Sequence, residues 1–141
     1  MLKHMFMPYR RYFDFRGRSS RAEYWSFFLL MAGIIALTAL LYAQAGAFEP
    51  GFDPETSDPG FGWTLGTAIF GIFFLVSGIP AIALEVRRWH DIGKSGWHWW
   101  IRFIPLVGTI IVLVFMAMKG NAGGNRYGPD PLPGGDARTF E

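Results

Sequence analysis

The densest group of polar side chains in this sequence follows a long apolar stretch and comprises Arg87, Arg88, His90, Asp91 and Lys94. A carboxylate that orients an imidazole supports general acid-base catalysis. However, His90 and Asp91 are sequence neighbours, which point in different directions on a helix, and no nucleophile of recognised context stands nearby. We therefore expect no catalytic residues here and no enzymatic activity.

Phosphate and metal chemistry also fit this group poorly. Gly93-Lys94-Ser95 imitates the end of a phosphate-binding P-loop, but Arg88 stands where that motif requires its first Gly, and no strand precedes it. Ser95 is explained as the N-cap of a following helix. The chain has no Cys, and its histidines have no short ligand spacing. They are His4, His90 and His98. We expect neither a metal nor a cofactor.

Two further polar groups lie far from the first one in the sequence. One precedes the first apolar stretch and the other belongs to a tail rich in Gly and Pro. We expect the three groups to converge on one cytoplasmic-side polar surface, where Asp91 or Asp130 pairs with an Arg in a planar, bidentate way. The alternative is that the arginines only anchor the topology and the tail motif is a turn. The candidates are Arg16, Arg18, Arg21, Glu23, Arg87, Arg88, His90, Asp91, Lys94, Asn125, Arg126 and Asp130.

The elements that must position these residues are apolar helices. Of the 141 residues, 51% are hydrophobic and 17% are charged, whereas an ordinary globular protein has about 25% charged residues. Two uncharged stretches of 25 and 26 residues cover 24–48 and 59–84, and a membrane-spanning helix needs about 20 apolar residues. The sequence therefore predicts an all-α integral membrane protein with helices at 24–46 and 63–86. Ser20 and Glu23 fit a capping box at the start of the first helix.

A third hydrophobic segment, 97–118, is interrupted in two ways. Arg102 leaves only 16 uncharged residues before Lys119, and we expect its guanidinium to reach headgroup level. Pro105 and Gly108 divide the segment into arms of residues 97–104 and 107–118, neither long enough to cross a bilayer alone. Two alternatives remain: a Pro-kinked third span, or a re-entrant hairpin of two half-helices.

Small residues recur along one side of each long helix. Ala32, Ala36, Ala39 and Ala43 share one face of the first helix, and a looser face of the second comprises Thr67, Gly71, Gly78 and Ala81. Such faces allow two helices to approach closely, although Ala and Gly are also simply common in membrane helices.

The distribution of Lys and Arg predicts the orientation. The leading 23 residues carry six basic groups, whereas the acidic loop 47–62 carries none. By the positive-inside rule the N-terminal segment 1–23 and the basic loop 87–96 are cytoplasmic, and the loop 47–62 is external. We therefore expect one membrane domain, 1–119, followed by a tail, 120–141, whose side of the membrane is undetermined.

Four motifs resemble a known family in the same order. They are Tyr12-Phe13-Asp14-Phe15-Arg16-Gly17-Arg18 with Arg21-Ala22-Glu23-Tyr24-Trp25, then Arg87-Arg88-Trp89-His90-Asp91-Ile92-Gly93-Lys94-Ser95-Gly96-Trp97, then Ile104-Pro105-Leu106-Val107-Gly108, and Asn125-Arg126-Tyr127-Gly128-Pro129-Asp130-Pro131. The chain resembles the YhaH/YhaI-type family of small bacterial inner-membrane proteins, a domain of unknown function. It departs from that family in Trp89, where Leu is more usual, and in its long acidic first loop. The resemblance implies an integral inner-membrane protein without assigning an activity.

The charged groups are the basis for predicting the function of this protein. We expect a non-enzymatic scaffold or partner-binding membrane subunit whose arginines hold anionic lipid headgroups or an acidic partner segment. A homo-oligomer or a membrane protein partner fits this role, whereas nucleic acid does not, because the net charge is only +2. One alternative is a small oligomeric transporter or pore. A lipid-modifying enzyme is the third, and it rests on His90 and Asp91 alone.

Overall fold

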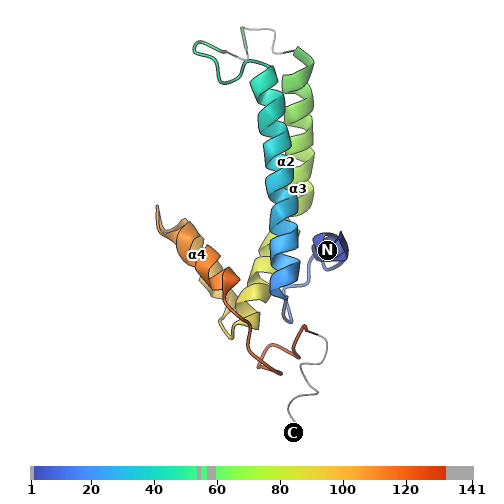
Figure 1. Cartoon of the computed structure of the whole chain (residues 1–141), viewed down its shortest axis with the longest axis vertical. Helices are drawn as coiled ribbons and strands as arrows, with labels where there is room; N and C mark the ends of the chain where they lie inside the picture. The colour runs from blue at the N-terminus through green and yellow to red at the C-terminus, as the bar shows by residue number, and fades with distance from the viewer. Residues whose placement is uncertain (1, 54, 57–59, 133–141) are drawn as a thin grey trace. The chain divides into compact units, whose positions relative to one another are not determined.

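The computed structural model describes residues 2–53, 55–56 and 60–132, and these residues form helices and turns without a strand. Parts of the expected acidic loop, Asp58 included, and the expected tail beyond 132 lie outside them. The all-helical prediction is confirmed for the described residues. In chain order, the elements are α1 (Leu2–Arg10), α2 (Arg21–Gln44), α3 (Gly60–Asp91), the 3₁₀ helix η1 (Gly96–Phe103) and α4 (Gly108–Ala117) (Figure 1).

The start of α2 follows from its capping residue. The backbone N–H of Glu23 donates to Ser20 Oγ at 3.2 Å, which satisfies one of the first helical amides that have no intrahelical acceptor. α2 consequently begins at Arg21, three residues before the apolar stretch. The sequence analysis did not predict α1.

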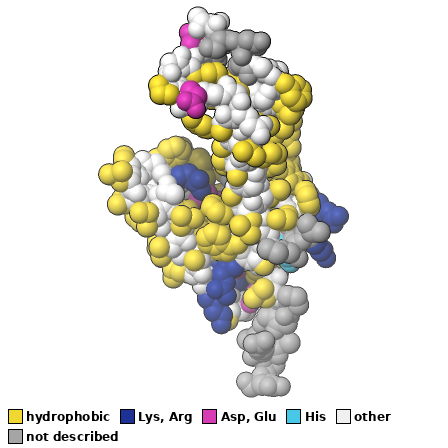
Figure 2. Space-filling view, turned by 45° about the horizontal axis from the view of Figure 1, so that its top comes forward, with side chains coloured by type: hydrophobic (Ala, Val, Ile, Leu, Met, Phe, Trp, Pro, Cys, Tyr) yellow, Lys and Arg dark blue, Asp and Glu magenta, His cyan; other side chains and the backbone are white. Residues whose placement is uncertain are grey.

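α2 and α3 are 24 and 32 residues long, and each is apolar enough and long enough to cross a membrane. Only 17% and 22% of their most apolar windows are buried. Large aliphatic side chains are instead exposed, such as Leu40 at 56% and Leu75 at 76%. Hydrophobic side chains also cover much of the face shown in Figure 2. This surface suits lipid rather than water, because helices in a soluble core bury their apolar side chains.

The chain divides into two compact units, of which the second comprises residues 28–78. Inside it, α2 and α3 lie side by side (Figure 1), and two glycines of α3 make the close contacts. A Cβ on Gly62 would lie 3.0 Å from the carbonyl oxygen of Leu41, and one on Gly66 would lie 3.1 Å from the Tyr42 ring. Close approach of backbones is typical of Gly in membrane helices.

The small-residue faces noted in the sequence take part in this contact only through Thr67, whose Oγ1 lies 3.3 Å from the Tyr42 hydroxyl of α2. The four alanines of the α2 face are exposed, and Gly71 and Gly78 of the α3 face have open space around them. Residue spacing identified small residues on a common side but not which side faces the neighbouring helix.

The first unit comprises residues 1–27 and 79–141, and its third hydrophobic segment folds back on itself. Pro105 forces the preceding residue away from helical geometry, and Ile104 accordingly adopts an extended conformation that ends η1. The turn includes Leu106 with a positive φ of 65°. A Cβ on Gly108 would collide with the Ile101 carbonyl oxygen, so only Gly permits this approach of α4 to η1.

Trp89 of α3 contacts both the start of η1 and the end of α4, the two arms of this helical hairpin. Its fully buried ring lies 5.2 Å from the His98 ring, near the start of η1, and 5.1 Å from the Phe115 ring, near the end of α4. The beginning and the end of the third segment therefore lie together at α3. The first arm is a 3₁₀ helix capped by Ser95, whose hydroxyl accepts from the Trp97 N–H at 3.4 Å, as expected for an N-cap.

Candidate functional site

Five of the candidate residues form the buried centre of the first unit. We call Arg18, Glu23, Arg87, Arg88 and Asp91 the arginine cluster; each is at most 5% exposed. The sequence analysis expected these residues on a surface, and the structure places them inside. Burial of charged groups is tolerated where they are paired and hydrogen-bonded, and here the chain itself supplies the partners.

Arg18 connects the N-terminal segment to α3 and to the tail. Its Nε donates to Asp91 Oδ1 at 2.9 Å. Its two Nη groups donate to the backbone carbonyls of Asn121, Gly123 and Gly128. Since these acceptors lie 103 to 110 residues further along the chain, one guanidinium joins three distant segments.

Arg87 holds the N-terminal segment against α3. Its Nε donates to Ser19 Oγ at 2.9 Å and its Nη2 to Glu23 Oε1 at 3.3 Å. Its Nη1 donates to the carbonyls of Arg11 and Asp14. The Ser19 N–H donates in return to the Arg87 carbonyl at 3.2 Å, so the contact is reciprocal.

Arg88 performs the same role at the end of the hairpin. It donates to the carbonyls of Met116 and Met118, which belong to the last turn of α4 and the residue after it. Carbonyls at a helix C-terminus have no intrahelical donor, so Arg88 caps α4. It also donates to Asp91 Oδ2. Asp91 therefore bridges two arginines, Arg18 and Arg88, instead of forming the expected bidentate pair with one.

The tail motif is docked onto the end of α3. The Tyr127 ring stacks on His90 with centroids 4.0 Å apart and planes at 5°. Asn125 Nδ2 donates to the His90 carbonyl at 2.9 Å, and Asp130 Oδ2 accepts from the Gly123 N–H at 3.2 Å. The Arg126 guanidinium lies 4.7 Å from the Tyr127 ring centroid. The three polar groups singled out in the sequence thus meet within one unit.

His90 and Asp91 have different partners despite their adjacency. His90 Nδ1 is 3.1 Å from the Gly17 carbonyl oxygen, whereas Asp91 receives the two arginines. The pair therefore lacks the mutual hydrogen bond of an acid-base dyad. Within the described residues, no three His, Asp or Glu side chains are grouped as metal ligands.

The remaining basic candidates are exposed. Arg16, Arg21, Lys94 and Arg126 have exposed side chains, in contrast to the three buried arginines. Motif membership alone did not separate these two kinds of basic residue. The difference arises from which guanidinium groups meet carbonyl oxygens of other segments.

Sequence reasoning missed two ion pairs of this unit. Arg11 pairs with Asp14 at 2.8 Å. Burial alone would raise the pKa of the Asp14 carboxyl, but hydrogen bonds from the Arg11 side chain and the Arg16 N–H hold this pKa below its ordinary value. Arg102 of η1 pairs with the buried Glu85 of α3. Two sequence features could have indicated these pairs. Arg11 and Asp14 are opposite charges three residues apart, and Glu85 and Arg102 are single charges that border apolar segments.

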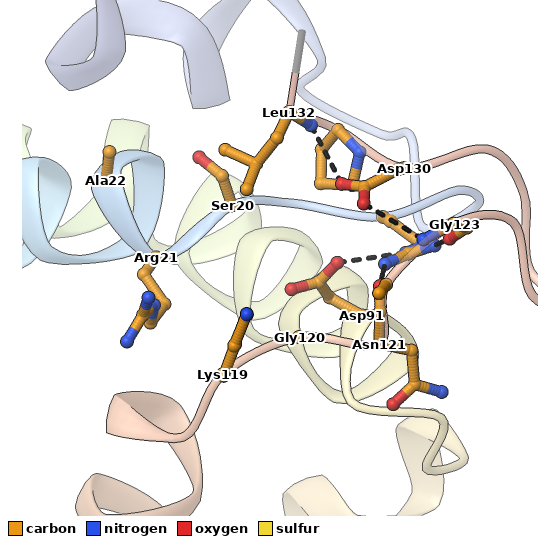
Figure 3. Close-up of a pocket in the computed structure, with 13 residues that line it drawn as sticks. Ser20, Arg21, Ala22, Asp91, Lys119, Gly120, Asn121, Gly123, Asp130 and Leu132 are labelled. Carbon is orange, nitrogen blue, oxygen red and sulfur yellow. Dashed lines mark hydrogen bonds and ion pairs between the residues drawn. The ribbon is translucent and has the colours of Figure 1, made fainter. Parts of the chain in front are cut away.

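A cavity of about 430 Å³ borders the arginine cluster (Figure 3). Its walls come from the residues around the start of α2, the end of α3 and the tail. Arg21 at the start of α2 and Lys119 in the segment after α4 line it, as do Asp91 and Asp130. We call this cavity the tail pocket. Its thirteen lining residues are Arg18, Ser20, Arg21, Ala22, Asp91, Lys119, Gly120, Asn121, Ala122, Gly123, Asp130, Pro131 and Leu132.

The chain matches a protein family and several known membrane proteins. Residues 12–129 match the family described as "Protein of unknown function (DUF805)". The chain is 34% identical over 122 residues to the inner membrane protein YhaH of Escherichia coli, an alignment that covers 86% of this chain and 90% of YhaH. It is 31% identical over 122 residues to the inner membrane protein YhaI of the same organism, covering 86% and 89%. No solved structure matches the chain.

Proposed function

The chain belongs to the DUF805 family and is a membrane protein, and we propose that it serves as a non-enzymatic scaffold of the inner membrane. In this role the arginine cluster holds the N-terminal segment, the hairpin and the tail together as one platform at the cytoplasmic side. The exposed basic residues around the platform then contact anionic headgroups or a membrane protein partner.

The observation that carries this proposal is the internal use of the buried guanidinium groups. Arg18, Arg87 and Arg88 donate to nine different backbone or side-chain groups other than Asp91. An arginine that binds substrate directs its donors into an open site, whereas these donors end on the chain's own oxygens. Their role is therefore to assemble the unit, which leaves recognition to the exposed residues.

The proposed topology has two spans, α2 and α3, with the N-terminus in the cytoplasm and a re-entrant hairpin after α3. η1 has eight residues and α4 has ten; at about 2.0 and 1.5 Å per residue, each arm is about 15 Å long. The hydrocarbon core is about 30 Å thick. A hairpin whose two ends meet at Trp89 returns the tail to the side of the N-terminal segment.

A reporter at the C-terminus tests this arrangement. A side-sensitive reporter fused after Glu141 should report the cytoplasm, and the same reporter fused at position 50, in the acidic loop, should report the periplasm. A periplasmic signal after Glu141 would mean three plain spans and would overturn the shared platform, because Arg18 and the tail would then lie on opposite sides of the membrane.

The scaffold role is tested by cross-linking in intact membranes. A photoreactive residue at the exposed Arg16 or Lys94 should yield discrete adducts with a lipid headgroup or with one membrane protein. Ile72, which is 66% exposed on α3, is the matched position that faces acyl chains. Equal adduct patterns at all three positions would contradict recognition by the platform.

A further inference from the structure

We propose that the tail pocket binds a phosphate group, with Arg21 and Lys119 as its ligands. The ligand class is a phosphate ester, carried either by an anionic lipid headgroup or by a soluble molecule. This inference rests on the proposed topology in one respect: a pocket beside the first turn of α2 and the end of the hairpin lies at headgroup level only if both elements leave the membrane there.

The two cations are available to a ligand. Arg21 and Lys119 are exposed, and neither has a hydrogen-bond or ion-pair partner among the described residues. Figure 3 shows both side chains on the same side of the pocket, from the start of α2 and from the segment after α4. This contrasts with Arg18 of the same lining, whose donors are already used.

The acidic side chains of the pocket do not cancel this charge. Asp91 is neutralised by Arg18 and Arg88. Asp130 accepts the backbone N–H groups of Gly123 and Leu132 through its two carboxylate oxygens. Counting Arg88 with the lining, four cations face two carboxylates, so the pocket retains a net charge of +2. An anion is therefore the complementary ligand.

The backbone adds donors to the two cations. The pocket is lined by Arg21 and Ala22, whose N–H groups lie too early in α2 to have intrahelical acceptors. The positive end of a 24-residue helix favours a phosphate at this place. The lining also includes the apolar Ala22, Pro131 and Leu132, which suit the carbon skeleton of a phosphate ester. A volume of about 430 Å³ lies within the usual range for small-molecule sites.

The test compares two charge-matched double variants of the full chain, purified and reconstituted. Arg21→Gln with Lys119→Gln removes the pocket cations, whereas Lys3→Gln with Arg10→Gln removes two exposed cations of α1 that do not line the pocket. Each protein is titrated with phosphatidylglycerol in phosphatidylcholine nanodiscs and, separately, with glycerol 3-phosphate in detergent. All four side chains are exposed, so thermal unfolding should be unchanged in both variants.

We expect the pocket variant to lose about tenfold in affinity for the phosphate ester and the control variant to lose less than twofold. Binding of phosphatidylglycerol alone identifies a lipid as the source of the phosphate, and equal binding of glycerol 3-phosphate identifies a soluble ester. Equal losses of affinity in the two variants would mean that the total positive charge of the protein, and not the pocket, determines binding, and would overturn the proposal. If the unaltered chain bound neither phosphatidylglycerol nor glycerol 3-phosphate, the proposal would also be overturned.

A third variant adds charge instead of removing it. Ala22→Glu places a carboxylate at the pocket, and a helix N-terminus tolerates acidic residues well. We expect this variant to fold normally and to bind the ester as weakly as the pocket variant does. The two proposals fail in different ways. A cytoplasmic C-terminus without ester binding would refute the pocket alone, and equal adducts at Arg16, Lys94 and Ile72 with intact ester binding would refute the scaffold role alone. A periplasmic C-terminus would refute both, because Arg21 and Lys119 would then lie on opposite sides of the membrane.

Discussion

Arg18, Arg87 and Arg88 show why this cluster requires arginine. Each guanidinium donates in at least three directions, to a carboxylate or hydroxyl and to two or more carbonyls. A planar group with five N–H donors provides this geometry, whereas an ammonium group is a compact point charge with three donors. At these positions Lys is consequently not a conservative replacement.

Arg87→Lys therefore tests the cluster at the scale of one residue. The variant keeps the charge but loses donors to Ser19, Glu23 and the carbonyls of the N-terminal segment, and leaves buried acceptors unpaired. We expect a loss of about 3 kcal/mol in stability, the usual effect of breaking a buried pair, measured by thermal unfolding of the purified protein in detergent. The matched control is Arg16→Lys at an exposed site, which should melt like the unaltered chain; equal melting of both variants would contradict the structural role of Arg87.

The hairpin of η1 and α4 shows how one proline and one glycine set the course of an element. Pro105 ends η1 because it restricts the backbone of Ile104. Gly108 is the first residue of α4, and it lies so close to the backbone of η1 that a side chain would not fit there. The hairpin in turn delivers the carbonyls of Met116 and Met118 to Arg88. The position of the tail thus depends on the turn at 104–107.

Gly108→Ala tests this element. The added Cβ would collide with the Ile101 carbonyl and lie 3.1 Å from that of Arg102, and backbone atoms cannot move aside as a flexible side chain does. We expect a lower unfolding temperature and faster proteolysis of the tail in detergent. Gly33→Ala is the control, because nothing lies within 4 Å of that position in α2 and Ala is favoured over Gly in helices by about 1 kcal/mol. A Gly108 variant as stable as the Gly33 variant would argue against the hairpin.

The whole molecule is characterised by apolar side chains on its outside. Within the described residues, exposed large hydrophobics occur along α2, along α3 and on the hairpin, for example Leu40, Leu75 and Ile110. The five charged residues of the arginine cluster are instead buried where segments of the first unit meet. This is the inverse of a water-soluble protein and agrees with relatives named as inner membrane proteins.

Retention by membranes is the prediction at this scale. The protein should stay in the pellet after washing isolated membranes with high salt and then at alkaline pH, because two inserted helices of this length are held by hydrophobic burial rather than by surface charge. A peripheral protein followed in the same preparation should be released. Recovery of this chain in the soluble fraction would contradict membrane insertion.

The sequence by itself determined the properties that depend on local composition. The uncharged stretches 24–48 and 59–84 contain most of α2 and most of α3. Ser20 predicts the start of α2, and the break at Pro105 to Gly108 predicts where the third segment divides. These features were predictable because helix capping, proline geometry and apolar length act over a few neighbouring residues.

Only the tertiary structure decided what the arginines do. Residue type and motif made Arg16 and Arg18 equivalent in the sequence, yet Arg16 is exposed and Arg18 is buried. The distinction comes from partners such as Asp91 and Gly128, which lie 73 and 110 residues away along the chain. Whether a guanidinium meets carbonyls or solvent depends on how distant segments pack, and one sequence without its fold contains no local signal for that pairing.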